Sequence, residues 1–407
     1  MRFEFSTARR IVFGAGVTEQ IPSLAAGYGE RVFLLLGGTA DRMSHVLEAL
    51  AARDLATTIF NVGGEPTTET AQAAVTAARE AETDVVVAIG GGSVMDTGKV
   101  VAAMLANEGE LSDYLEIVGK GRPLREQSAP MIAVPTTAGS GAEVTYNAVL
   151  SVPQQQVKVS MRSPLMLPRW AIVDPLLTHS MPPALTASTG LDALTQLIEA
   201  FVSNKANPLT DGICREGIQR AARSLRRAFE DGGNTEARMD MSLASLFSGM
   251  ALANAKLGAV HGFAGPLGGI TNAPHGAICG RLLPCVMQAN VLALQNRRAE
   301  DSENPGGDAQ GDRNHDAPQL GTQAALARFD EIARLLTGKD TANASDAVSW
   351  IGDLCTALGL PGLRRYGLST VDFPLIVEKT QKASSMQGNP VELSEEELTA
   401  ILDWAIG

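Results

Sequence analysis

Short apolar runs alternate with amphipathic segments over the first 177 residues of the chain, and this alternation constrains the fold more than any other feature. Runs such as RVFLLL at 31–36 and MIAVP at 131–135 have the length and composition of buried strands, and TAQAAVTAAREAE at 70–82 has helical spacing. Such alternation is typical of βαβ units around a parallel sheet. We therefore predict a doubly wound, parallel-sheet α/β domain that binds a nucleotide over residues 1–177, with an edge hairpin formed by residues 3–13.

The second part of the chain, residues 178–407, lacks strand signals. It is rich in segments with helical spacing, such as ALTQLIEAFVS and DGICREGIQRAARSLRRAFE. We predict an all-helical second domain. Within it, residues 297–319 are polar, rich in Gly and Asp and almost devoid of apolar side chains. This composition predicts a solvated loop between helices, without a catalytic role.

The charge of the chain argues against several classes of partner. Its formal net charge of −12 at pH 7 repels phosphate backbones and anionic lipid, so we expect a small-molecule partner instead of nucleic acid or a membrane. Its apolar runs are shorter than the roughly 20 residues of a membrane-spanning helix, and no C-x-x-C pair occurs. We expect a cytoplasmic protein with reduced, mostly structural thiols. The cysteines are Cys214, Cys279, Cys285 and Cys355.

Two glycine-rich segments follow predicted strands. GGGS at 90–93 comes directly after DVVVAI and before a segment with helical spacing. Such a turn presents backbone N–H groups and a helix N-terminus to a pyrophosphate without obstruction by side chains. The second segment, PTTAGSGAEVT at 135–145, places small hydroxyl residues between glycines, which suits a phosphate or the nicotinamide ribose. Taken alone, the first segment could equally be a simple tight turn, and the second could be the N-cap of a helix. The prediction of a cofactor site therefore depends on the position of both segments directly after predicted strands.

Four side chains in the second domain have the chemistry and spacing of a metal site. Asp192 and Gln196 are four residues apart, so a helix places them on one face, and a segment rich in Gly and Pro separates His261 from His275. Each histidine alone is more often a core or turn residue, but the combination with Asp192 favours a shared site. Mixed nitrogen and oxygen donors suit Fe²⁺, Zn²⁺, Mn²⁺ or Ni²⁺. The remaining histidines, His45, His179 and His315, are expected to be bystanders.

Ordered motifs along nearly the whole chain make it resemble the iron-containing (group III) alcohol dehydrogenase family. They are GGGSVMDTGK, PTTAGSGAEVT, AIVDP, TGLDALTQLIEAFVS, GAVHGFAGPLGG, PHGAICGRLLP and the closing GNPVELSEEEL. The resemblance implies a two-domain enzyme, with NAD or NADP in the cleft, that interconverts a small alcohol and its aldehyde or ketone by hydride transfer. It also implies one divalent metal ion, Fe²⁺ in the first place and Zn²⁺ as the alternative, bound in the helical domain with the substrate. We expect a homodimer.

The resemblance also assigns roles to residues. The metal ligands map onto Asp192, Gln196, His261 and His275, and His261 counts as catalytic as well. Lys158 matches a family lysine close to the nicotinamide and is expected to act in catalysis and in cofactor binding. The cofactor-binding positions are Gly37, Gly90, Gly91, Gly92, Ser93, Asp96, Thr136, Thr137, Ser140 and Lys158.

Three positions depart from the family pattern. Gln196 stands where the family usually has histidine, which weakens the site because an amide oxygen is a poorer donor than imidazole. Gly265 stands where a histidine often serves proton relay, so water or the cofactor ribose would deliver the proton. Gly37 stands where many members have an aspartate that holds the adenosine ribose. Its loss removes the charge penalty against a 2′-phosphate and admits NADP(H), with Thr39 or Arg42 as helpers.

Two other functions remain as alternatives. A reductase with the same fold and cofactor could act without metal, as maleylacetate reductases do, and the metal content of protein purified without added ions separates the two. A cofactor-binding protein without catalysis is less expected, because both cofactor segments and three of the four ligand positions keep their chemistry. Turnover of short aldehydes would exclude it. The positions expected to line the substrate pocket favour a small, uncharged substrate. They are Asn147, Asn254, Phe263 and Leu267.

Overall fold

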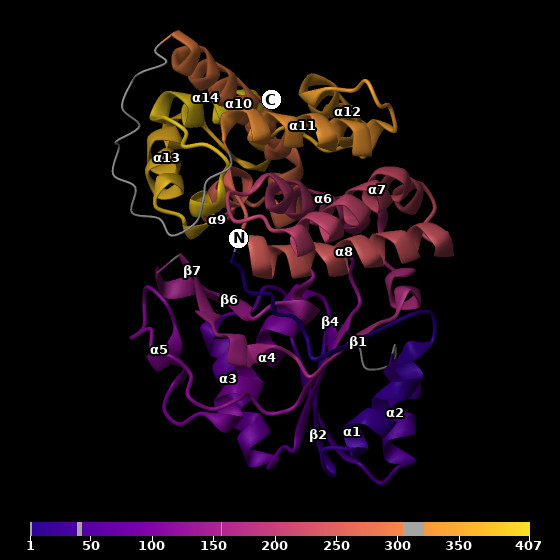
Figure 1. Ribbon diagram of the computed structural model, residues 1–407. Helices are drawn as coiled ribbons and strands as arrows, with labels where there is room; N and C mark the ends of the chain where they lie inside the picture. Colours follow the sequence, from indigo (N-terminus) through magenta and orange to yellow (C-terminus); the bar gives the residue numbers. More distant parts are fainter. Residues whose placement is uncertain (1, 39–42, 156, 304–320) are drawn as a thin grey trace. The chain divides into compact units, whose positions relative to one another are not determined.

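The computed structural model describes residues 2–38, 43–155, 157–303 and 321–407, and the chain forms two compact units (Figure 1). The sheet unit comprises Ser6–Met181 and Gly233–Ser242. The helical unit comprises Pro182–Gly232 and Leu243–Gly407 together with Met1–Phe5. Residues 178–181, which the sequence pattern assigned to the helical domain, thus group with the sheet unit.

A six-stranded parallel sheet forms the core of the sheet unit. Its strands are β1 (Arg10–Phe13), β2 (Arg31–Leu36), β3 (Ala56–Asn61), β4 (Val85–Gly90), β5 (Met131–Pro135) and β8 (Trp170–Val173). They lie in the order β1-β8-β5-β4-β2-β3, and all neighbours are parallel. The order reverses at β2 and β4, because the chain runs from β2 outward to β3 and then returns to the other side of β2. In open parallel sheets, ligands bind outside the carboxyl ends of the strands at such a switch point.

Helices cover both faces of this sheet. They are α1 (Ile21–Ala26), α2 (Ser44–Ala51), α3 (Thr68–Glu80), α4 (Gly92–Ala106) and the short α5 (Leu111–Tyr114). Successive side chains of β2 point to opposite faces. Phe33 and Leu35 belong to a core cluster with residues of α3 and α4, whereas Leu34 belongs to a second cluster with residues of α1 and α2. The prediction of a doubly wound parallel sheet is therefore confirmed.

The prediction of an edge hairpin at residues 3–13 is wrong. Only β1 forms in this segment, and it pairs in parallel with β8. The N–H groups of Arg9 and Arg10 donate to the carbonyl oxygens of Pro168 and Arg169, so the segment finds its partners far along the chain. Alternation of apolar residues indicates a strand but does not identify its partner. The antiparallel pair of the unit is instead formed by β6 (Asn147–Val152) and β7 (Val157–Arg162), which the sequence pattern did not reveal.

The helical unit contains long helices that pack on one another. They are α6 (Pro183–Val202), α7 (Pro208–Glu230), α8 (Thr235–Ala255), α9 (Ala259–Ile270), α10 (His275–Glu303), α11 (Thr322–Thr337), α12 (Ala344–Ala357), α13 (Phe373–Gln381) and α14 (Glu395–Ile406). The first turns of α8 belong to the sheet unit. Helix α6 is buried along nearly its whole length and packs against α7 and α10. Among the described residues no strand follows β8, so the prediction of a helical second half is confirmed.

Helix α10 corrects the predicted polar loop. It continues to Glu303, so residues 297–303 are helical and the prediction of a loop is wrong there. Arg297 and Arg298 are exposed, and a solvated helix end needs no apolar face that would reveal its period. The rest of the predicted loop, residues 304–319 with His315, lies outside the described residues.

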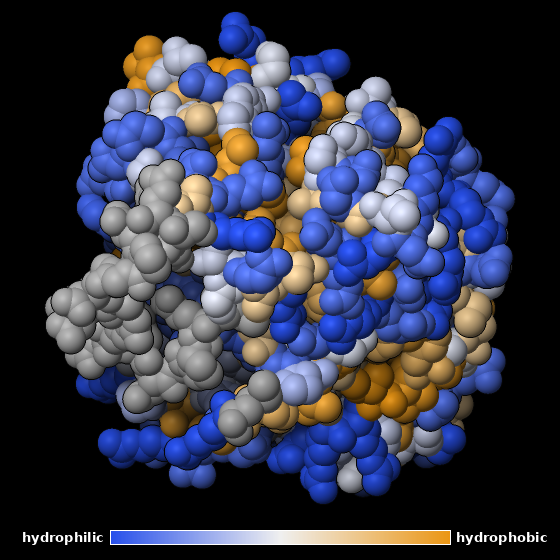
Figure 2. Space-filling model, turned by 45° about the horizontal axis from the view of Figure 1, so that its top comes forward, coloured by the Kyte–Doolittle hydropathy of each residue, from blue (hydrophilic) through white to orange (hydrophobic). Residues whose placement is uncertain are grey.

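By length and hydropathy alone, the segment His275–Ala299 of α10 would suffice to cross a membrane, contrary to the expectation from the apolar runs. However, 72% of its most apolar window is buried inside the protein, as in the core helix of a globular domain. Hydrophilic residues cover most of the face drawn in Figure 2, and hydrophobic residues form separate patches on it. The apolar character of α10 is therefore explained by packing.

Candidate metal centre and cofactor-binding turns

Three helices of the helical unit bring four potential metal ligands together. Asp192 lies on α6, His261 lies on α9, and His275 and Cys279 lie in the first turns of α10. One donor atom of each side chain lies within 4.8 Å of the other three. Asp192 and Cys279 are buried, whereas the His275 side chain is 48% exposed. The cluster is therefore held in the core and open at His275.

The distances within the cluster leave space for an ion between the donors. Asp192 Oδ1 lies 3.4 Å from His261 Nε2 and 3.6 Å from His275 Nε2. Cys279 Sγ lies 3.8 Å and 3.7 Å from the same two nitrogens. Asp192 Oδ1 is buried and makes no hydrogen bond. Because a buried carboxylate oxygen without a hydrogen bond is costly, this donor set fits a divalent cation.

Gln196, the remaining predicted ligand, lies one helical turn beyond Asp192 on α6. Its Nε2 atom donates to Asp192 Oδ2 at 3.3 Å, and its buried Oε1 atom makes no hydrogen bond. The structure therefore places Gln196 beside the metal cluster and in contact with Asp192. Its direct binding to an ion stays a prediction.

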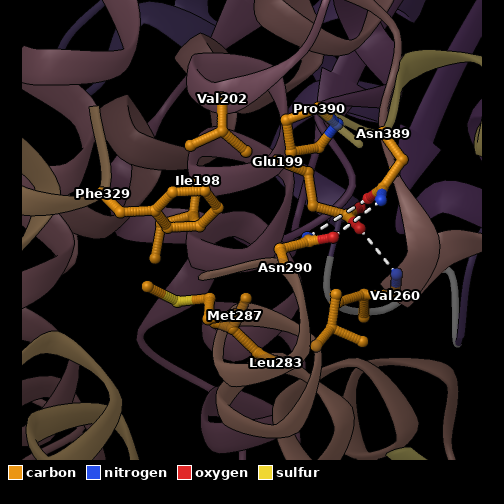
Figure 3. Close-up of a pocket in the computed structure, with 12 residues that line it drawn as sticks. Ile198, Glu199, Val202, Val260, Leu283, Met287, Asn290, Phe329, Asn389 and Pro390 are labelled. Carbon is orange, nitrogen blue, oxygen red and sulfur yellow. Dashed lines mark hydrogen bonds between the residues drawn. The ribbon is translucent and has the colours of Figure 1, made fainter. Parts of the chain in front are cut away.

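Glu199 is a buried residue of α6 that the sequence analysis missed. Its Oε2 atom lies 2.6 Å from His261 Nδ1. Its Oε1 atom accepts a 2.7 Å hydrogen bond from the backbone N–H of Val260 (Figure 3). A carboxylate on Nδ1 fixes the tautomer in which Nε2 is free to bind a metal, as is common for metal-binding histidines. The sequence spacing could have indicated this role, because Glu199 follows Asp192 by seven residues and so lies on the same face of the helix.

Asn389, in the GNP segment near the C-terminus, holds the start of α9. Its Oδ1 atom accepts a hydrogen bond from Ala259 N at 3.1 Å. Its Nδ2 atom donates to Asn290 Oδ1 at 2.8 Å (Figure 3). Gly258 allows this approach, because a Cβ atom there would lie 2.8 Å from Asn389 Oδ1 and 3.1 Å from Glu199 Oε1. The GNP segment thus positions His261 through the backbone of α9.

Electrostatic coupling in the cluster changes its proton affinities. Burial raises the pKa of the Cys279 thiol, but the imidazoles of His275 and His261 outweigh it and hold the pKa below its usual value. Burial likewise raises the pKa of Asp192, and the two histidines bring it below its usual value. Burial lowers the pKa of His261, yet Cys279 and Glu199 raise it well above the usual value. The cluster therefore favours two anions that attract positive charge, either protons or a metal ion.

In the sheet unit, the predicted glycine turn at residues 90–93 lies at the carboxyl end of β4, where α4 begins. The N-cap residue of α4 is Gly91, which has no side chain that could accept a hydrogen bond from the first N–H groups of α4. A Cβ atom on Gly91 would lie 3.4 Å from the Thr137 side chain, and one on Gly92 would lie 3.1 Å from Ser140 Oγ. The two glycine-rich segments therefore face each other beyond adjacent strands, and a side chain on either glycine would fill the cradle between them.

Gly37 lies at the end of β2, beside this turn. Its N–H donates to Ile89 O at 3.1 Å, and a Cβ atom on it would lie 2.9 Å from Val94 Cγ2. The ends of β2 and β4 thus approach closely at the switch point. Glycine at this position has a packing reason in addition to any role toward the cofactor.

The other predicted cofactor residues have partners within the sheet unit. Thr136 N donates to Gly90 O at 2.9 Å, which joins the two glycine-rich segments. Asp96 accepts a hydrogen bond from Val149 N at 3.0 Å and pairs with the buried Lys99 Nζ at 2.9 Å, so it ties α4 to β6. Lys158, on β7, forms an ion pair with Glu65. Contacts of Asp96 and Lys158 with a cofactor stay predictions.

Several further positions were expected to take part in the site. Phe263 and Leu267 of α9 are completely buried, so the prediction that they line a substrate pocket is wrong and their face of α9 belongs to the core. Gly265 is exposed, and a Cβ atom on it would meet no atom within 4 Å. His45 and His179 belong to the sheet unit and not to the metal cluster. Residues 39 and 42 lie outside the described residues.

Comparison with known families gives two matches. A family model described as iron-containing alcohol dehydrogenase matches residues 8–175, and one described as the C-terminal domain of the Fe-containing alcohol dehydrogenase family matches residues 186–406. The 1,3-propanediol dehydrogenase of Klebsiella pneumoniae is 37% identical over 329 residues, which cover 79% of this chain and 76% of that protein. Alcohol dehydrogenase 4 of Saccharomyces cerevisiae is 32% identical and covers 90% of this chain and 86% of its own.

Solved structures agree in fold over the whole chain. A 1,3-propanediol oxidoreductase superposes with a TM-score of 0.86 at 32% identity and covers 100% of both chains. A sulfoacetaldehyde reductase from Bifidobacterium kashiwanohense in complex with NAD⁺ superposes with a TM-score of 0.82 at 27% identity, over 100% of this chain and 99% of that one.

Proposed function

The chain belongs to the iron-containing alcohol dehydrogenase family, and we propose which of its residues bind the metal ion, hold the cofactor and position the substrate. Its relatives are named propanediol and alcohol dehydrogenases, so the chain is a metal-assisted oxidoreductase that interconverts an alcohol and its aldehyde or ketone. We propose NAD or NADP as its cofactor. The observation that carries the assignment of the metal centre is the buried oxygen of Asp192. This oxygen has no hydrogen bond and lies within 3.6 Å of both imidazole nitrogens, His261 Nε2 and His275 Nε2.

We propose that Asp192, His261 and His275 bind the ion. When bound, a divalent ion supplies Lewis acidity toward the oxygen of the substrate. Glu199 keeps His261 Nε2 directed at the centre by accepting the Nδ1–H hydrogen bond. His275 is half exposed, so the substrate reaches the centre on that side. The 1,3-propanediol named for two of the relatives supports a short, uncharged substrate, whereas the sulfoacetaldehyde reductase is named for a charged one.

We propose that the cradle formed by residues 90–93 with Thr137 and Ser140 binds the cofactor pyrophosphate through backbone N–H groups and hydroxyls. When bound there, the nicotinamide would supply the redox chemistry by exchanging a hydride with the substrate carbon. Lys158 is proposed to act beside the nicotinamide after leaving Glu65. Because Gly265 has no side chain that could relay a proton, exchange of the proton of the substrate oxygen would fall to water or to a hydroxyl group of the bound cofactor.

Several finer assignments belong to the same proposal. The absence of a carboxylate at Gly37 supports use of NADPH as well as NADH. The four described cysteines are free and buried, which suits a reducing compartment such as the cytoplasm. We expect a homodimer, which light scattering after size-exclusion chromatography would test.

The test of the proposed function begins with protein purified without added metal. We expect about one equivalent of a divalent ion by mass spectrometry and reduction of short aldehydes with NADH or NADPH. A strong chelator should remove the ion and the activity together, and one equivalent of Zn²⁺ or Fe²⁺ should restore the activity. Full turnover by metal-free protein would support a metal-independent reductase resembling maleylacetate reductase instead.

A further inference from the structure

Resting on the proposed function, we propose that the Cys279 thiolate is the fourth protein ligand of the metal ion. In this proposal Gln196 orients Asp192 and does not bind the ion, and the sulfur donor shifts the preference of the site from Fe²⁺ toward Zn²⁺. The sequence motifs pointed to Gln196 as the ligand and to Cys279 as a structural thiol.

Four of the six distances between the donor atoms of the cluster agree with a tetrahedral site. With metal–nitrogen and metal–oxygen bonds of about 2.1 Å and a metal–sulfur bond of about 2.3 Å, a tetrahedron separates nitrogen from oxygen by about 3.4 Å and nitrogen from sulfur by about 3.6 Å. Asp192 Oδ1 lies 3.4 and 3.6 Å from the two imidazole nitrogens. Cys279 Sγ lies 3.8 and 3.7 Å from them. Each of these four separations thus agrees with the expected one to about 0.2 Å, so the four donor atoms need to move little to bind one ion.

Helix geometry explains how Cys279 reaches the centre. It follows His275 by four residues on α10, so both side chains lie on the same face of the helix. Asp192 and Gln196 have the same spacing on α6, but there the amide group points to Asp192. Gln196 Nε2 donates to Asp192 Oδ2, while Asp192 Oδ1 remains free. One oxygen of the carboxylate is therefore held by the amide, and the other is left for the ion.

Cys279 also differs from the other thiols of α10 and its neighbours. Cys285 donates to Arg281 O at 3.6 Å, and Cys355 donates to Gly280 O at 3.3 Å, so backbone carbonyls satisfy both. The polar atoms that the structure shows near Cys279 Sγ are instead the two imidazole nitrogens of the cluster. Together with Asp192, a thiolate gives two negative charges that match a divalent ion. Soft thiolate ligands favour Zn²⁺ over harder ions.

The experiment uses the full-length protein loaded with Co²⁺, which reports a bound thiolate by a sulfur-to-cobalt charge-transfer absorption in the near ultraviolet. We expect this absorption in the wild type and in the matched control Cys285→Ser, whose thiol lies on the same helix but outside the cluster. Cys279→Ser should lose the absorption and about 100-fold in Zn²⁺ affinity, whereas Gln196→Ala should keep the absorption and lose about 10-fold at most.

A second variant tests whether the loss of absorption in Cys279→Ser could arise from misfolding. Cys279→Asp replaces the thiolate by another anionic ligand, so it should bind one Co²⁺ without the charge-transfer absorption. In anaerobic competition, the double variant Gln196→His with Cys279→Ala should bind a larger share of Fe²⁺ than the wild type does. Absorption that persists in Cys279→Ser, or one bound Co²⁺ without it in the wild type, would overturn the proposal. Failure of the proposed function is distinguishable, because the wild type would then turn over aldehydes while it binds no ion at all.

Discussion

The proposed cofactor-binding turns of the sheet unit and the proposed metal centre of the helical unit are built in different ways. The turns consist of two continuous segments, residues 90–93 and 135–145, each of which follows a strand and presents mainly backbone and small hydroxyl groups. The metal centre consists of four side chains from three helices, from Asp192 to Cys279. A site of the first kind depends on the absence of side chains, and a site of the second kind depends on the packing that brings side chains together. Substitutions should therefore damage the two sites by different mechanisms.

The largest expected effect comes from His261→Ala, which breaks the metal centre alone. Removal of an imidazole ligand should lower both metal content and kcat/KM by more than about 100-fold, beyond the effect of removing an outer partner such as Glu199. Metal analysis and steady-state kinetics would measure this loss, while cofactor titration should stay close to that of the wild type. His45→Ala, at an exposed position of α2, is the matched control. Full activity of His261→Ala would show that the centre is not catalytic.

Gly91→Val should break the cofactor cradle alone. A branched side chain would occupy the space needed by the pyrophosphate, and we expect cofactor affinity to fall by about 100-fold, equivalent to about 2.7 kcal/mol. The nearest protein atom to the new Cβ would be 3.4 Å away, so the chain should still fold and keep its metal content. Fluorescence titration with NADH and NADPH measures the loss. Gly212→Val, at a helix position with open space, is the control, and near-native cofactor affinity in Gly91→Val would make the turn purely structural.

Glu143, within the second glycine-rich segment, is a buried carboxylic acid. Like the metal centre, the cofactor-binding region therefore contains a buried acidic side chain. Burial raises the pKa of Glu143 from 4.5 to about 7. The folded state therefore holds a proton that the unfolded state has released, so stability should fall as pH rises from about 4.5 to 7 and stay level above. Glu143→Gln should remove this fall and increase stability at pH 8 by up to about 3 kcal/mol.

Thermal or urea unfolding of both proteins at pH 5 and pH 8 measures this difference. The gain at pH 5 should be small, because the carboxyl group is then protonated in the folded state and only partly ionised in the unfolded one. Equal stabilities of the two proteins at both pH values would contradict the raised pKa.

The smallest expected effect concerns the choice of cofactor. Gly37 offers no carboxylate to the adenosine ribose, so kcat/KM with NADPH should lie within about tenfold of that with NADH, a difference below about 1.4 kcal/mol. Steady-state kinetics with both cofactors decides this. A preference of several hundredfold for NADH would show that another acidic residue holds the ribose hydroxyls.

The sequence by itself determined the fold class and the family, and it supplied most of the candidate site residues. Periodicity predicted the parallel sheet and the helical second half, because each strand or helix carries its own period of apolar side chains. The glycine turns were also readable, since a turn at the end of a strand is a local feature. Three members of the metal cluster were found from residue type and spacing, namely Asp192, His261 and His275.

Tertiary structure alone decided which residues complete the two sites. The pairing of β1 with β8, the contact of Glu199 with His261 and the approach of Asn389 to α9 all join segments far apart in sequence. Cys279 had the same four-residue spacing from His275 as Gln196 has from Asp192, yet spacing cannot tell which side chain points to the centre. That choice depends on how α6, α9 and α10 pack, because a helix fixes the direction of a side chain only relative to its own axis.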